Sequence, residues 1–189
     1  MKTRIIAGSV FVVVLAVTFF LAPVAVTAVT MGVMVVMASH ELLFTTGLVR
    51  NVRLNVYSAL MAVFVTLWSF LGASQAVMLL GILLYLMLLC SELLLSSGKE
   101  PVAHVGYCLL SGLVVPLLLT SLLRIRAWEH GGLYLLIPFI MAYCSDTGAY
   151  FIGVTMGRHK MCPNISPKKS WEGFAGGIVI AAASLMLYG

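Results

Sequence analysis

Charged residues are scarce in this sequence. Only 9% of its 189 residues are Asp, Glu, Lys or Arg, and the chain holds a single aspartate. An ordinary soluble domain carries about 25% charged residues. Hydrophobic residues make up 62% of the chain, and the mean hydropathy is +1.12. Because a water-soluble fold has no way to bury this much apolar surface, the composition excludes that class and indicates an integral membrane protein.

The regular alternation of polar and apolar residues that marks the strands of a membrane barrel is also missing. The apolar runs are continuous, and most approach the roughly 20 residues that a helix needs to cross the hydrocarbon core. Backbone polar groups must be paired within the protein there, which a helix achieves by itself. We predict an all-α membrane protein, a polytopic transmembrane helix bundle with six spans and a partial seventh, as a single transmembrane domain over residues 1–189. The predicted spans are Ile5–Leu21, a second ending near Ser39, Leu54–Leu71, Ser74–Leu95, Val102–Leu123, Gly131–Thr155 and the partial run Gly173–Gly189.

The net charge of +5 comes from basic residues that lie between the apolar runs. In that position they orient a membrane protein rather than bind nucleic acid, because cytoplasmic loops collect Lys and Arg. If the N-terminus is cytoplasmic, the outer loops hold only Arg124 and Arg126. The inner loops, which include the polar segment 156–171, then hold Lys2, Arg4, Arg50, Arg53, Lys99, Arg158, Lys160, Lys168 and Lys169.

One acidic residue, Asp146, lies well inside a predicted span. An ionised group at that depth costs roughly 2.5–3.5 kcal/mol even on the lenient insertion scale. At helical spacing Ala142, Asp146, Ala149 and Gly153 share one face, and small residues let another backbone approach. We therefore expect Asp146 to face the bundle interior. It is a candidate metal ligand, since Mg²⁺ prefers carboxylate oxygens together with substrate phosphates; the alternative is a structural hydrogen bond to a neighbouring helix.

The polar segment that follows this span is rich in cations. Pro163 and Pro167 prevent it from continuing as a helix. Ser170 is a candidate N-cap of the next helix, whose first turn would hold Glu172. A helix N-terminus beside basic side chains is a good anion site. The simpler alternative is a basic cytoplasmic loop that only follows the positive-inside bias.

Three stretches resemble the phosphatidate cytidylyltransferase (CDP-diacylglycerol synthase) family. They are Ser145-Asp-Thr-Gly-Ala-Tyr-Phe-Ile-Gly153, then Gly157-Arg-His-Lys160, then Ile165-Ser-Pro-Lys-Lys-Ser-Trp-Glu-Gly173. The resemblance implies an enzyme that converts CTP and phosphatidic acid to CDP-diacylglycerol and pyrophosphate with Mg²⁺. It further implies a bacterial inner membrane, with the lipid bilayer as a partner; a homodimer through small-residue helix faces is an additional prediction.

The resemblance also implies roles for individual residues. Asp146 would hold Mg²⁺, and Lys168 and Lys169 would act with it on the reacting phosphates. Substrate contacts would come from Arg158, Lys160 and Ser166. Trp171 and Glu172 also count among the predicted substrate-binding residues, and they would fix the 156–171 loop against the bundle.

The family's long C-terminal signature is absent from residues 1–189, and the last apolar run stops without a polar cap. We therefore expect a chain that is cut short and inactive alone. The main alternative is a non-catalytic membrane module that binds anionic lipid headgroups through 156–171. A transporter would need repeats and more interior polar residues, and a CDP-alcohol phosphotransferase would need several clustered aspartates.

Overall fold

A computed structural model describes residues 14–96, 101–163 and 166–189. It divides the chain into two compact units, Met1–Glu129 and His130–Gly189, which are described separately below. The prediction of a single domain therefore stays a prediction. Most of the predicted first span lies outside the described residues; within it, residues 14–20 are helical.

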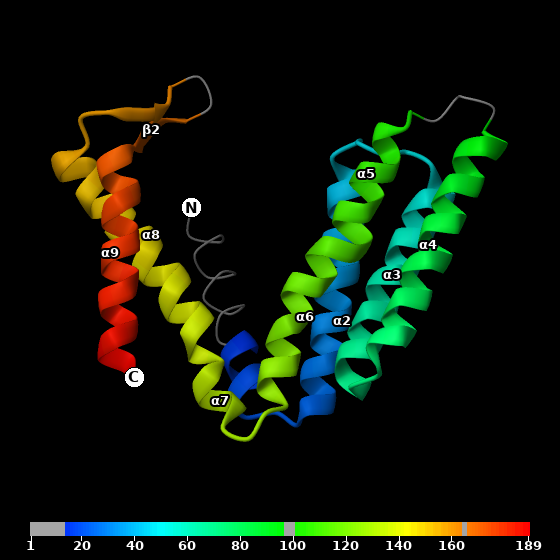
Figure 1. Cartoon of the computed structure of the whole chain (residues 1–189), viewed down its shortest axis with the longest axis horizontal. Helices are drawn as coiled ribbons and strands as arrows, with labels where there is room; N and C mark the ends of the chain where they lie inside the picture. The colour runs from blue at the N-terminus through cyan, green and yellow to red at the C-terminus, as the bar shows by residue number, and fades with distance from the viewer. Residues whose placement is uncertain (1–13, 97–100, 164–165) are drawn as a thin grey trace. The chain divides into compact units, whose positions relative to one another are not determined.

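In the first unit the described secondary structure is helical (Figure 1). Helix α3 packs against α2, α4, α6 and the π-helical segment η2. The segments α5, η2 and α6 follow one another without a break and together form one candidate span, Ala103–Arg126. The elements are α2 (Val24–His40), η1 (Glu41–Thr45), α3 (Val52–Leu71), α4 (Gln75–Leu95), α5 (Ala103–Leu109), η2 (Leu110–Val114) and α6 (Val115–Arg126).

Buried polar groups join the helices of this unit. The Tyr85 hydroxyl on α4 lies 2.8 Å from the Ser58 hydroxyl on α3 and donates to the Cys108 carbonyl, also at 2.8 Å. Cys108 lies two residues before the start of η2, where the hydrogen-bond ladder shifts from the α to the π pattern. Gly112 permits the approach, since a Cβ there would lie 2.5 Å from the Tyr85 hydroxyl. The contact satisfies backbone and side-chain groups where no water is available.

Replacing Tyr85 by Phe is expected to lower the free energy of unfolding by about 1–2 kcal/mol, because the Cys108 carbonyl loses a buried donor. Thermal unfolding in detergent micelles measures the change. Tyr107→Phe, a hydroxyl removed from an exposed tyrosine of α5, is the matched control and should leave stability unchanged. Equal stability of both variants would contradict the assigned role of Tyr85.

The second unit begins with a helical turn and contains two long helices joined by a hairpin (Figure 1). The two strands pair antiparallel, with Lys160 opposite Ser170 and Cys162 opposite Ser166. The Tyr188 hydroxyl donates to the Leu133 carbonyl at 3.0 Å and ties the last residues to the first turn. The elements are α7 (Gly131–Tyr134), α8 (Leu136–Met156), β1 (Lys160–Cys162), β2 (Ser166–Ser170) and α9 (Trp171–Tyr188).

Glycines let α8 and α9 approach closely. A Cβ at Gly177 would lie 2.8 Å from the Ser145 carbonyl oxygen, and one at Gly173 would lie 2.7 Å from the Ala149 carbonyl oxygen. A Cβ at Gly148 would meet the Ile180 side chain at 2.8 Å. Small residues at a membrane helix interface permit this backbone contact, whose stability comes from close packing rather than from hydrophobic exclusion. The pair forms a rigid base for the hairpin.

The all-α membrane class is confirmed: six described helices are long and apolar enough to cross a bilayer. Two predicted bounds differ. The second span continues through η1 to Thr45, because His40 and Glu41 are exposed and leave the backbone ladder unbroken. The predicted partial run is an 18-residue helix, α9, that starts at Trp171. The predicted polar loop 156–171 contains the end of α8 and the hairpin.

Candidate functional site

The hairpin of the second unit begins where α8 ends. Gly157 lies so close to the Gly153 carbonyl and the Ser170 side chain that a Cβ there would overlap both. The chain then turns into β1, and both strands lie at an edge of a two-stranded sheet. Pro167 is tolerated in β2 because an edge strand can lack one N–H donor. The hairpin therefore accommodates Pro167, which could not continue a helix, and its two strands remain paired.

The first turn of α9 anchors this hairpin. The Ser170 hydroxyl accepts a hydrogen bond from the Gly173 N–H at 3.2 Å and caps the helix, which confirms the predicted cap. Ser170 is only 4% exposed. The Trp171 N–H donates to the His159 carbonyl at 3.0 Å. The start of α9 and the start of β1 are thus joined through main-chain atoms.

Glu172 joins the same two segments through its side chain. Its carboxylate accepts hydrogen bonds from the backbone N–H groups of Arg158 and His159, each at 3.2 Å. It also lies 2.6 Å from Nδ1 of the His159 ring. A carboxylate in the first turn of a helix interacts favourably with the helix dipole. Glu172 is the only acidic residue of the chain after Asp146, and Arg158 and Lys160 line the same pocket.

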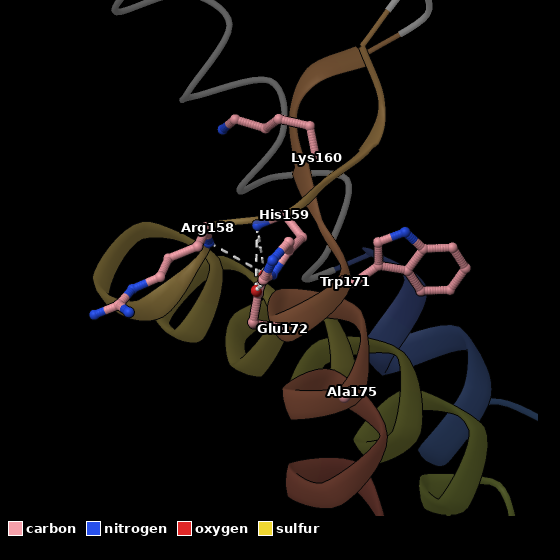
Figure 2. A pocket seen from close by; sticks show the side chains of 6 residues that line it. All are labelled: Arg158, His159, Lys160, Trp171, Glu172 and Ala175. Carbon is pink, nitrogen blue, oxygen red and sulfur yellow. Dashed lines mark hydrogen bonds and ion pairs between the residues drawn. The ribbon is translucent and has the colours of Figure 1, made fainter.

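An open pocket of about 770 Å³ surrounds this carboxylate. Figure 2 shows Arg158 and Lys160 on one side of the His159–Glu172 pair and Trp171 on the other. The structure therefore brings together the predicted residues Arg158, Lys160, Trp171 and Glu172. It adds His159, which the sequence analysis did not select. The lining residues are Arg158, His159, Lys160, Trp171, Glu172 and Ala175.

The other predicted hairpin residues lie on β2, outside this pocket lining. Ser166 is half-buried, whereas Lys168 and Lys169 are exposed. Both lysines stand on the short hairpin that also carries Lys160. Because they are consecutive residues of a strand, their side chains point to opposite faces of the hairpin. We call the hairpin, with these three lysines and Arg158, the basic hairpin.

Asp146 lies in the middle of α8, and its side chain is exposed. Within the described unit Asp146 therefore does not contact α9; that it faces the bundle interior stays a prediction. The stripe of α8 that contacts α9 contains Ser145, Gly148 and Ala149, and Asp146 flanks it. Among the described residues no hydrogen bond or ion pair to its carboxylate is found, nor any group of three or more His, Cys, Asp and Glu side chains able to hold a metal.

Comparison with known proteins identifies the family. The sequence matches the Cytidylyltransferase family profile over residues 2–189. The phosphatidate cytidylyltransferase of Bacillus subtilis (strain 168) is 30% identical over 190 residues, which cover 96% of this chain and 68% of the relative. The chain belongs to the cytidylyltransferase family. The predicted enzyme class, a nucleotidyltransferase of phospholipid biosynthesis, is thereby confirmed.

Other members of the cytidylyltransferase family match over shorter regions. The phosphatidate cytidylyltransferase of Staphylococcus saprophyticus is 37% identical over 92 residues, 49% of this chain and 35% of that protein. That of Mycobacterium tuberculosis (strain H37Rv) is 44% identical over 59 residues, 31% of this chain and 18% of that protein. These two matches cover less than half the length of each relative. No solved structure matches it.

Proposed function

We propose that this chain takes part in the transfer of a cytidylyl group from CTP to phosphatidic acid, with the basic hairpin as the phosphate-binding element. In this reaction a phosphate oxygen of the lipid attacks the α-phosphorus of CTP. The bond between that phosphorus and the β-phosphate bridging oxygen breaks, and pyrophosphate leaves. The observation that carries the proposal is the position of the basic hairpin, which joins the adjacent ends of two membrane-spanning helices.

Two polyanionic substrates must meet in this reaction, so fixed cations are needed to stabilise their combined charge. Arg158 offers a planar fork that suits two phosphate oxygens, whereas Lys160, Lys168 and Lys169 act as point charges. Ser166 offers a hydroxyl donor at the start of β2. The Trp171 indole, 56% exposed at the first residue of a span, suits the interface between headgroups and hydrocarbon.

Mg²⁺ fits this arrangement only as a site shared with the substrates. The ion commonly takes one or two protein carboxylates plus substrate phosphates. Asp146 offers a carboxylate without a protein partner among the described residues, whereas the Glu172 oxygens are already hydrogen-bonded. We assign Asp146 as the protein ligand. The ion, when bound, would neutralise phosphate charge.

Counting the spans predicts which side of the membrane the hairpin faces. Segment 46–51 and the hairpin lie on one side if all six described spans cross, and segment 127–130 lies on the other. The basic bias then places the hairpin in the cytoplasm, where CTP is found, and the bacterial relatives favour an inner membrane. A homodimer stays a prediction; the small residues of α8 and α9 are already used between these two helices.

Substituting both β2 lysines tests the role of the basic hairpin. Lys168→Gln combined with Lys169→Gln is expected to lower kcat/KM by about 100-fold, because two charge-assisted phosphate contacts are lost. The assay follows label from CTP into CDP-diacylglycerol in mixed micelles that contain phosphatidic acid and Mg²⁺.

Arg50→Gln, which removes an exposed cation outside the hairpin, is the control and should keep full activity. Unchanged turnover in the double variant would contradict the phosphate-binding role of Lys168 and Lys169. The proposed transfer replaces the expectation of a chain that is inactive alone, so absence of label in CDP-diacylglycerol for the unmodified protein would contradict the proposal and support that expectation.

The exposed aromatic pair Trp171 and Phe174, whose rings meet edge to face at 6.2 Å, favours a second candidate function. Aromatic side chains and basic residues at a membrane surface also characterise a module that binds anionic lipid headgroups. Such a module would bind vesicles containing phosphatidic acid, CTP would not displace them, and no CDP-diacylglycerol would form.

A further inference from the structure

The imidazole of His159 lines the pocket next to Glu172, with Lys160 above the pair and the Arg158 side chain extending away to one side (Figure 2). Its side chain is 81% exposed, although one ring nitrogen is held firmly by Glu172. We propose that His159 is a phosphate-binding residue of this pocket and that Glu172 is the residue that positions it. This inference rests on the proposed function, since that function supplies the phosphate-bearing substrates.

Both backbone groups of His159 are bonded to the first turn of α9. Its N–H donates to the Glu172 carboxylate at 3.2 Å, and its carbonyl accepts from the Trp171 N–H at 3.0 Å. The Arg158 N–H holds the same carboxylate from a second direction. The carboxylate is therefore fixed by two main-chain donors before it contacts the ring. A side chain fixed in this way can orient another group precisely.

The contact between the His159 ring and Glu172 determines which ring nitrogen remains available to a ligand. An ionised carboxylate only accepts hydrogen bonds, so Nδ1, 2.6 Å from Glu172 Oε1, is the donor. The ring therefore presents Nε2 to its surroundings, and among the described residues no partner of Nε2 is found. A histidine held through Nδ1 by a carboxylate is a common way to aim Nε2 at a ligand.

The surrounding charges indicate a phosphate as that ligand. His159 is flanked in sequence by Arg158 and Lys160, and all three line the pocket. Nε2 of a protonated imidazole donates a charge-assisted hydrogen bond, which phosphate oxygens accept. Glu172 would repel a phosphate and has its oxygens occupied, so it acts through His159 rather than on the substrate.

Two amide substitutions distinguish the role of Nδ1 from that of Nε2. The short side chain of His159→Asn can still donate to Glu172 from near the Nδ1 position, but nothing replaces Nε2. The longer His159→Gln places its amide nitrogen near the Nε2 position. We expect His159→Asn to lower kcat/KM by about 10- to 100-fold while hydrogen exchange at the Arg158 and His159 amides stays slow. His159→Gln should retain more activity than His159→Asn.

A binding measurement tests the proposal without requiring the protein to be catalytically active. The histidine ring nitrogens are labelled with ¹⁵N, and the whole protein is placed in phosphatidylcholine nanodiscs. Pyrophosphate is added to one sample, and a second set of nanodiscs contains phosphatidic acid. We expect the His159 Nε2 resonance to shift with either probe; a shift with pyrophosphate alone indicates the nucleotide phosphates, and one with phosphatidic acid alone the lipid. His130, which directly precedes α7 and does not line the pocket, is the internal control and should not shift.

Glu172→Ala should abolish this shift and speed exchange at the Arg158 and His159 amides. A shift in a protein without cytidylyltransferase turnover would overturn the proposed function and support His159 as a phosphate contact. No shift with either probe, or full activity in His159→Asn, would overturn the inference and leave the pair a purely structural link.

Discussion

Asp146→Asn is expected to lower the rate of CDP-diacylglycerol formation by about 10²–10³-fold, the loss typical of removing one preorganised electrostatic contact to a reacting group. The substitution keeps the size of the side chain and removes its charge. Because the carboxylate is exposed and makes no hydrogen bond among the described residues, the free energy of unfolding should not fall. Asparagine should in fact lie more easily within a span, since burying a charge there is costly.

The assay measures turnover across a range of Mg²⁺ concentrations, and thermal unfolding is measured beside it. Glu41→Gln, which neutralises an exposed carboxylate of the first unit, is the matched control and should retain activity. If Asp146→Asn keeps its turnover and its dependence on Mg²⁺, the carboxylate is not a metal ligand. A lower unfolding temperature would instead indicate a structural partner for Asp146.

Gly177→Leu is expected to separate α8 from α9 and to lower the free energy of unfolding by about 3 kcal/mol, the upper end of the cost of overpacking. Even a Cβ at this position would lie 2.8 Å from the Ser145 carbonyl oxygen and 3.1 Å from the Ala149 Cβ. These neighbours belong to the backbone or attach directly to it, so they cannot rotate away. The hairpin joins these two helices and would lose its geometry with them.

Ala182→Leu, at an exposed position of the same helix, is the matched control and should change stability little. Thermal unfolding in detergent micelles gives the stability, and the transfer assay reports whether the pocket survives. Wild-type stability of Gly177→Leu would show that α8 and α9 are not packed through their glycines.

The sequence predicted the membrane class because hydropathy is a local property. A run of about 20 apolar residues is long enough to span a bilayer whatever it packs against. The ends of the helices were harder to predict from the sequence. The π-helical segment η1 carries the second span past His40 and Glu41, since exposed polar side chains do not interrupt backbone pairing. The cap by Ser170 was predicted correctly, because capping also depends on a few neighbouring residues.

The candidate site was predicted in part for the same reason. The cations of the basic hairpin are close in sequence, so any turn brings them together. Asp146 was placed on the face of α8 that carries Ala149 and Gly153, and both of these do contact α9; the contact stripe also includes Ser145 and Gly148, however, and Asp146 only flanks it. Helical periodicity gives the faces of a helix, but the partner helix selects among them.

By itself, the sequence determined the membrane-spanning segments, the family and the basic segment, because each depends on residues that are adjacent or regularly spaced. Only the tertiary structure paired His159 with Glu172, thirteen residues apart, and surrounded that pair with the cations of the pocket. The contact exists because the glycines of α8 and α9 bring the two helices together, which places the residues after α8 beside the first turn of α9. Such a distance in space depends on packing between elements, and no local pattern of residue types encodes it.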